Sequence, residues 1–203
     1  MSRPPIIGVL ALQGDVREHL RALTACGADV RPVRRPVELV GLDGIVLPGG
    51  ESTTIDKLSR IFGLRDPLTA ALDAGLPAYG SCAGMILLAK RVLDGTADQQ
   101  TFAALDITVR RNAFGRQVES FETDVDLDGV AGGPVHAVFI RAPWVESIDD
   151  GVQILGAVVP PGLDEAKIIA VRHENLMATS FHPEVTDDLR IHRYFVELVR
   201  AAQ

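Results

Sequence analysis

The chain has 203 residues, of which 47% are hydrophobic and 23% charged, and its formal net charge is −7. These values are typical of a globular protein with a sizeable core, and we expect a single domain over residues 1–203. The acidic balance argues against generic binding of nucleic acids or anionic membranes. Apolar runs shorter than a membrane span, only two cysteines and no signal-peptide pattern lead us to expect a cytoplasmic protein.

Short apolar runs alternate with amphipathic segments in the first half of the chain. Continuous apolar runs are typical of parallel strands that helices cover on both faces. The predicted strands are 6–11, 29–33, 44–47 and one that begins at residue 76. The predicted helices are 16–26, 37–40, 52–61, one from about Pro67 to Gly75, and one that ends at residue 90. This alternation predicts a doubly wound, mostly parallel sheet flanked by helices, with catalytic loops at the carboxyl ends of the strands.

Capping residues are predicted for two of these helices. Asp15 is expected to cap the helix that begins at Val16, and Ser52 or Thr53 the helix that ends at Ile61.

The second half changes to shorter strands joined by turns of Gly, Asp and Pro. The strands predicted there are 106–110, 117–127, 135–140, 152–159, 166–172 and 176–181. We expect several of them to pair antiparallel and to extend the sheet or pack on its edge. A final amphipathic helix is predicted over residues 188–201.

Cys82 lies in a Gly-Ser-Cys-Ala-Gly turn between a predicted strand and a predicted helix. Small residues flank a reactive side chain where a strained turn comes close to neighbouring backbone. The start of a helix favours the nucleophilic thiolate, and the amide of Ala83 is placed to donate to a developing oxyanion. The alternative is a buried cysteine at the start of a helix. The other cysteine, Cys26, precedes Gly27 and is expected to pack as a small apolar residue.

A cysteine nucleophile needs a base, and His182 is the strongest candidate. It ends a predicted strand and precedes Pro183, which favours an extended backbone. Glu184 then points to the same side and is placed to orient the imidazole. The alternative is a His-Pro-Glu turn on the surface.

The four remaining histidines have other predicted environments. His19 is expected on a solvated helix face, among Arg17, Glu18 and Arg21. His136 begins a strand, His173 lies at a hairpin tip, and His192 falls within the last helix.

A second glycine-rich turn, Pro-Gly-Gly-Glu-Ser-Thr-Thr over residues 48–54, follows a predicted strand. Consecutive glycines let backbone amides approach a ligand and offer a second oxyanion donor. A phosphate-binding loop is an alternative, but the Gly-Lys-Ser/Thr ending of such loops is absent from the segment. A plain glycine turn followed by a helix cap is the other alternative.

Together these three segments resemble class I glutamine amidotransferases, and further blocks resemble the glutaminase subunits of pyridoxal 5′-phosphate synthases. The blocks are Leu10–His19, Leu47–Thr54, Arg111–Val118, Phe139–Pro143 and Ser180–Glu184. The resemblance extends over nearly the whole chain and implies a flavodoxin-like fold.

The resemblance implies roles for individual residues. Cys82 would attack the side-chain amide of glutamine, His182 would transfer protons, and Glu184 would orient His182. The amides of Ala83 and Gly50 would stabilise the oxyanion. The residues implied to hold glutamine are Gly50, Glu51, Ser52, Arg111, Ile140 and Arg141.

The reaction would convert glutamine to glutamate and release ammonia. The resemblance implies a partner that uses this ammonia: a barrel-shaped synthase subunit that combines it with a pentose phosphate and a triose phosphate to make pyridoxal 5′-phosphate. The segment implied to dock on it contains Gln13, Asp15, Arg17, Glu18 and His19. The resemblance implies no metal and no cofactor. Three alternatives stay open: a glutaminase that serves another synthase, a cysteine peptidase or hydrolase on a similar fold, and a catalytically silent binding subunit.

Overall fold

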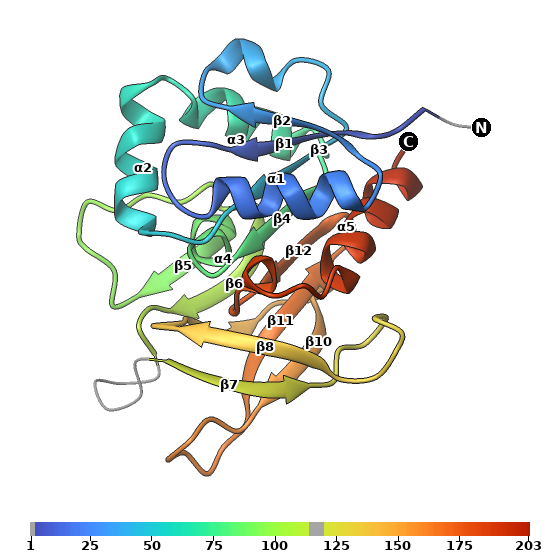
Figure 1. Cartoon of the computed structure of the whole chain (residues 1–203). Coiled ribbons are helices and arrows are strands. Elements are labelled where there is room, and N and C mark those ends of the chain that lie inside the picture. The colour runs from blue at the N-terminus through green and yellow to red at the C-terminus, as the bar shows by residue number, and fades with distance from the viewer. Residues whose placement is uncertain (1–2, 114–119) are drawn as a thin grey trace.

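The computed structural model describes residues 3–113 and 120–203 (Figure 1). The first part contains β1 Ile6–Leu10, α1 Val16–Ala25, β2 Asp29–Val33, η1 Pro36–Leu39, β3 Gly44–Leu47, α2 Ser52–Ile61, α3 Arg65–Asp73, β4 Ala78–Ser81, α4 Ala83–Leu88, β5 Ala89–Leu93 and β6 Leu105–Arg110. The second part contains β7 Ser120–Val125, β8 Val135–Ile140, β9 Trp144–Ile148, β10 Gln153–Val158, β11 Lys167–His173, β12 Leu176–Thr179, η2 Pro183–Val185 and α5 Arg190–Ala201.

Within the described residues, ten strands form one sheet in the order β2-β1-β3-β4-β12-β11-β9-β6-β5, with β10 paired to β11. The first five strands of this order are parallel, and they follow the flavodoxin-like pattern in which the chain reverses direction across the sheet at β1. Strands β9, β10 and β11 add antiparallel pairings, and β7 and β8 form a separate antiparallel pair. The predicted fold class is confirmed.

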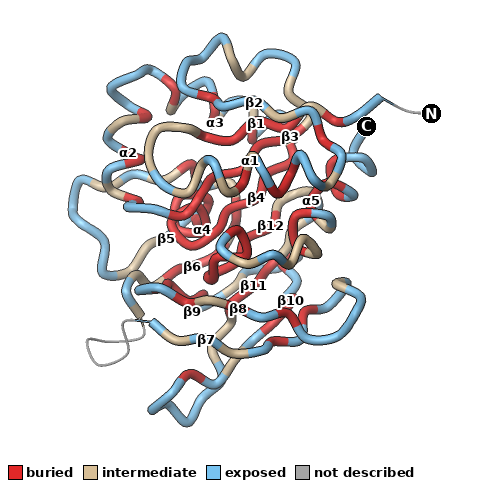
Figure 2. Tube along the Cα trace, in the orientation of Figure 1, coloured by how far each residue is buried: buried red, intermediate tan, exposed pale blue. Residues whose placement is uncertain are grey.

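Helices cover both faces of the parallel strands, with α1 and α5 on one face and α2, α3 and α4 on the other (Figure 1). Side chains alternate between the faces: Ile45 and Leu47 of β3 join the core that contains Leu68, and Val46 joins the core that contains Phe195. Each such side chain contributes about 1.5–3 kcal/mol by its burial. The buried residues therefore concentrate along the central strands (Figure 2).

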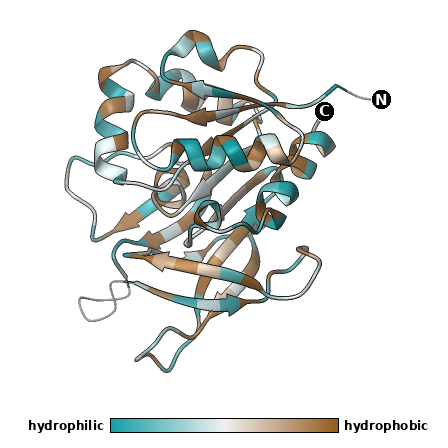
Figure 3. Cartoon of the chain, in the orientation of Figure 1, coloured by the Kyte–Doolittle hydropathy of each residue, from teal (hydrophilic) through white to brown (hydrophobic). Residues whose placement is uncertain are grey.

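Hydropathy follows the same division. The central strands are mostly hydrophobic, whereas the helices other than the buried, apolar α4 carry both hydrophobic and hydrophilic residues (Figure 3). In the part of the chain that the structure describes, no helix is both long enough and apolar enough to cross a membrane.

Two strands were absent from the sequence prediction. The helix expected to reach residue 90 ends at Leu88, and the chain passes directly into β5, which pairs with β6. Strand β9 lies between β6 and β11. The other predicted strands are confirmed within a few residues, although positions 117–119 of the one predicted over 117–127 lie outside the described residues.

Of the two predicted helix caps, Asp15 is confirmed in position only, and Ser52 or Thr53 is wrong. Asp15 occupies the N-cap position of α1, but its side chain makes no capping hydrogen bond and points toward His182 instead. The cap of α2 is Glu51, whose carboxylate accepts from the backbone N–H of Thr53 at 3.4 Å.

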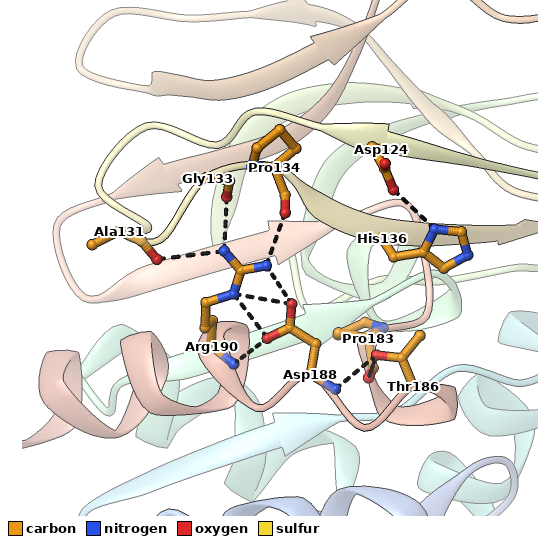
Figure 4. A network of polar contacts seen from close by, with 9 residues as sticks. All are labelled: Asp124, Ala131, Gly133, Pro134, His136, Pro183, Thr186, Asp188 and Arg190. Atoms are coloured by element: carbon orange, nitrogen blue, oxygen red, sulfur yellow. Dashed lines mark hydrogen bonds and ion pairs between the residues drawn. The ribbon is translucent and has the colours of Figure 1, made fainter.

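Hydrogen bonds connect the start of α5 to the turn that precedes β8 (Figure 4). The Arg190 guanidinium donates to the carbonyls of Gly133 and Pro134, at 2.7 and 2.8 Å, and pairs with Asp188 at 2.6 Å. Charge-assisted hydrogen bonds of this kind are about twice as strong as neutral ones. They fix the segment between η2 and α5, which follows the predicted triad residues His182 and Glu184.

Candidate active site

The carboxyl ends of β1, β3, β4 and β12 meet at one edge of the sheet because these strands are parallel neighbours. The loops that follow them line a cavity of about 300 Å³. Cys82, Ala83 and His182 line this cavity, so the structure brings the predicted nucleophile and base to one site. A hollow of about 630 Å³ near Pro77, at the amino ends of β3 and β4, contains none of the predicted site residues.

Cys82 is held in a tight turn between β4 and α4. Its φ of 47° and ψ of −101° are rarely adopted by residues other than glycine. A Cβ atom on Gly84 would lie 2.0 Å from the carbonyl oxygen of Leu47, and one on Gly80 would lie 2.4 Å from the carbonyl carbon of Gly84. Both glycines are therefore required by close backbone contacts around the thiol.

His182 and Glu184 form a buried hydrogen-bonded pair. Nδ1 of His182 lies 2.8 Å from Oε1 of Glu184, and the two residues are 5% and 1% exposed. The imidazole also packs against Gly49, where an added Cβ would lie 2.4 Å from Cε1 of His182. A larger residue at position 49 would displace the imidazole.

Opposite charges dominate the ionisation of this pair. Burial lowers the pKa of His182, but Asp15, Cys82 and Glu184 together outweigh burial and raise that pKa to about 12. Burial raises the pKa of Glu184, whereas His19 and His182 together hold it well below its usual value. We therefore expect a cationic His182 and an anionic Glu184 at neutral pH.

Asp15 is a second carboxylate on His182, with Oδ2 lying 3.4 Å from Nδ1. We expect Asp15→Asn to lower the pKa of His182, because the amide removes one of the charges that favour imidazolium. A raised histidine pKa stabilises the fold fully below about pH 6.5, and this contribution is lost as the pH rises through the folded-state pKa. Since Asp15 is partly exposed, we expect the variant to lose about 0.5–1 kcal/mol at neutral pH.

An NMR titration of the His182 ring and a thermal melt at pH 7 measure these two effects. Glu18→Gln is the matched control, because it removes a carboxylate from the same helix without a contact to His182. An unchanged His182 titration in Asp15→Asn would contradict the assigned interaction.

The same cavity is lined by the residues predicted to hold glutamine. These six residues, Gly50, Glu51, Ser52, Arg111, Ile140 and Arg141, all line it. The Arg111 guanidinium is fixed by Gln99 at 2.6 Å and by Glu51 at 3.0 Å. Residues 114–118 of the block that begins at Arg111 lie outside the described residues.

Four further residues belong to this region. Gln13 and Asp15, predicted as partner contacts, line the cavity, and Ile86 and Asn112 line it without having been predicted. Ile86 lies one turn beyond Cys82 on the short helix α4, a spacing that could have identified it. Asn112 has a φ of 44°, and its sequence neighbours gave no signal of that backbone conformation.

The solvated environment predicted for His19 is wrong, because this side chain is fully buried. Its Nδ1 lies 2.9 Å from Nε2 of His192, and its Nε2 lies 3.0 Å from Oγ of Ser81. His19 is thus unavailable to a docked partner in this structure, whereas Arg17 is exposed and Glu18 half-buried. The other cysteine, Cys26, is a half-buried free thiol outside the cavity.

Asp15, His182 and Glu184 offer possible metal-ligand atoms within 4.8 Å of one another. The group is better explained by ion pairing, because Nδ1 of His182 donates its hydrogen to Glu184 and offers no free lone pair. The site is therefore suited to proton transfer and nucleophilic attack.

Comparison with known proteins supports one chemistry. The profile of the SNO glutamine amidotransferase family matches residues 9–201. The chain is 66% identical to the pyridoxal 5′-phosphate synthase subunit PdxT of Nocardia farcinica (strain IFM 10152) over 198 residues, which cover 98% of this chain and 87% of the relative. It is 62% identical to the same subunit of Salinispora arenicola (strain CNS-205), with 98% of each chain covered.

Solved structures agree with these relatives. A crystal structure described as a glutamine amidotransferase has a TM-score of 0.86 and 45% identity, and covers 96% of this chain and 98% of its own. A structure of PurLQS from Thermotoga maritima has a TM-score of 0.69 at 17% identity, with 99% of each chain covered, and shows similarity of fold alone.

Proposed function

This chain belongs to the SNO glutamine amidotransferase family, and from that premise we propose that Cys82, His182 and Glu184 form its catalytic triad. The chain is the glutaminase subunit of pyridoxal 5′-phosphate synthase and supplies ammonia for vitamin B6 biosynthesis. The observation that carries the triad is the 2.8 Å contact between His182 and Glu184 in the cavity that Cys82 also lines.

In the proposed reaction, His182 already holds the proton of the Cys82 thiol as imidazolium, and the anionic sulfur attacks the side-chain amide carbon of glutamine. The new C–S bond moves the carbonyl electron pair onto oxygen. The intermediate collapses by breaking the C–N bond, and His182 protonates the departing ammonia. Water, deprotonated by His182, then attacks the thioester, the C–S bond breaks, and glutamate leaves.

Two backbone amides are proposed to stabilise the oxyanion. Ala83 follows the nucleophile directly, and Gly50 lines the same cavity. Gly50 has a φ of 149°, and an added Cβ would lie 2.6 Å from Oε1 of Gln13, so only glycine fits there. Removing one oxyanion donor typically lowers kcat about 10²–10³-fold, which makes this pair a large contributor to the rate.

The charged residues Glu51 and Arg111, which line the cavity, are proposed to bind the amino-acid end of glutamine. Arg111 would pair with the α-carboxylate, because its guanidinium is already oriented by Gln99 and Glu51. The carboxylate of Glu51 would accept from the α-ammonium. The α-carbon end of the substrate is thus held while its side-chain amide reaches Cys82.

We expect Arg111→Ala to raise KM for glutamine by about 10²-fold, which is the cost of losing a charge-assisted hydrogen bond. Arg110→Ala is the matched control: Arg110 lies next in sequence but pairs with Asp94 and Glu146, away from the cavity. Steady-state ammonia release should show a near-unchanged KM for the control. Equal KM changes in both variants would contradict the assignment.

The proposed partner is the synthase subunit, into which ammonia is delivered without loss to solvent. The docking surface is proposed around Gln13, Asp15, Arg17 and Glu18, which lie at or beside the mouth of the cavity. A cytoplasmic location is proposed with this metabolic role.

The function is tested by ammonia release from glutamine, with and without the purified synthase subunit. We expect activity that requires Cys82 and increases when the synthase is added. Equal rates with and without the synthase would refute activation by the partner, and release of ammonia by Cys82→Ala would refute the triad.

A further inference from the structure

A column of buried polar side chains lies behind the triad and has no role in the reaction described above. It contains His19 of α1, Ser81 of β4 and His192 of α5, all with 0% exposure. Polar side chains are rarely kept in an apolar core unless hydrogen bonds compensate their loss of water. The burial of these three side chains therefore depends on the hydrogen bonds that they make.

His19 contacts both sides of the triad. Its Nε2 lies 3.5 Å from Oε1 of Glu184 and 3.0 Å from Oγ of Ser81, the residue that directly precedes Cys82. Nε2 of His19 thus lies close both to the carboxylate of Glu184 and to the end of β4, which directly precedes Cys82.

The Glu184 carboxylate is oriented mainly through one oxygen. Oε1 accepts from Nδ1–H of His182 at 2.8 Å, and the same oxygen faces Nε2 of His19. Among residues 3–113 and 120–203, Oε2 of Glu184 has no hydrogen-bond partner. Besides Nδ1–H of His182, the described group that faces Oε1 most directly inside the core is therefore Nε2 of His19.

His192 supports the required proton arrangement. Its Nε2 lies 2.9 Å from Nδ1 of His19, and burial together with the nearby His19 lowers the pKa of His192 to about 3, so that it stays neutral. The carboxylate of Glu184 favours a hydrogen on Nε2 of His19, because a bare nitrogen lone pair would face a negatively charged oxygen.

We propose that His19 is a positioning residue for the glutaminase reaction, whose Nε2–H is shared between Oγ of Ser81 and Oε1 of Glu184 and holds the carboxylate in the orientation that receives His182. This inference rests on the triad proposed above. A side chain that only paired with Ser81 and His192 would not need to bring Nε2 within 3.5 Å of Oε1 of Glu184.

Two substitutions separate positioning from packing. In His19→Gln the side-chain NH₂ replaces the Nε2–H donor toward Glu184, whereas in His19→Asn it reaches only the Nδ1 position near His192. Both variants are smaller than histidine and polar. We expect kcat per folded enzyme to fall about 10–100-fold in His19→Asn with a near-unchanged KM, and to stay within about 3-fold of the parent in His19→Gln.

A double-mutant cycle tests the route through Glu184. In a Glu184→Ala background, His19→Asn should cause no further loss of kcat, because the oxygen acceptor that it positions is gone. Independent, multiplicative losses would overturn the inference, as would an unchanged kcat in His19→Asn or equal kcat losses in His19→Gln and His19→Asn.

The unmodified protein offers a test that does not depend on the folding of variants. With ¹⁵N-labelled histidine, the Nε2 of His19 should appear as a protonated nitrogen in the NMR spectrum at neutral pH, and a bare Nε2 would overturn the inference. Failure of the triad itself would be recognised separately, as ammonia release by Cys82→Ala.

Discussion

Cys82→Ala is expected to lower glutamine-dependent ammonia release by at least about 10⁴-fold, the loss typical of removing the nucleophile of a triad. No other thiol can replace it, because Cys26 lies outside the cavity. The measurement is ammonia release by the complex with the synthase subunit, compared with Cys26→Ala as the matched control. The control should keep the parental rate.

The backbone at Cys82 adds a second expectation for the same position. A residue other than glycine with a φ of 47° and a ψ of −101° costs roughly 1–3 kcal/mol. Cys82→Gly should therefore be inactive and yet more stable than Cys82→Ala, by about 1 kcal/mol after the greater flexibility of unfolded glycine is included. Denaturant titration of the two variants checks this, and equal stabilities would contradict strain at the nucleophile.

Gly84→Ala is expected to destabilise the fold by at least about 3 kcal/mol. The new Cβ would lie 2.0 Å from the carbonyl oxygen of Leu47, and this atom belongs to the central strand β3, which pairs with β1 and β4. Neither α4 nor β3 can move away without breaking the sheet or shifting Cys82. For a protein of this size, the expected fall in Tm is roughly 6–12 °C.

Gly95→Ala is the matched control for this substitution. A Cβ at position 95 would have its nearest neighbours at 3.4 Å, side-chain atoms of Gln99 and Val92. We expect its stability to stay within about 1 kcal/mol of the parent. A Gly84→Ala protein with parental Tm and parental glutaminase activity would show that the close contact is absent in solution.

The parallel half of the fold was predictable because β1 and β3 are continuous apolar runs, which a doubly covered sheet can bury. Strand β5 was missed because Ala89–Leu93 continues the helix-forming pattern of α4, and its strand conformation depends on pairing with β6. Pairing partners far along the chain are not visible in a local pattern.

The grouping of Cys82 with His182 and Glu184 was predictable from chemistry and spacing, since the carboxyl ends of parallel strands converge. Their roles stay predictions until the variants are measured, as does the single domain over residues 1–203.

The solvated environment of His19 was predicted wrongly from its charged neighbours. Its spacing of three residues from Val16 and four from Leu23 places it on the apolar face of α1, and that periodicity was the signal that could have shown its burial.

Strand β12 has a consequence for the order of folding. It lies between β4 and β11 in the sheet, yet it is the last strand of the described chain. During synthesis, β4 therefore keeps an open edge until Leu176–Thr179 emerges, and an open edge favours pairing with other chains. The insertion of β12 closes this edge and brings His182, which follows β12, to the cavity that Cys82 lines. With the proposed triad, glutaminase activity therefore requires that this edge has closed.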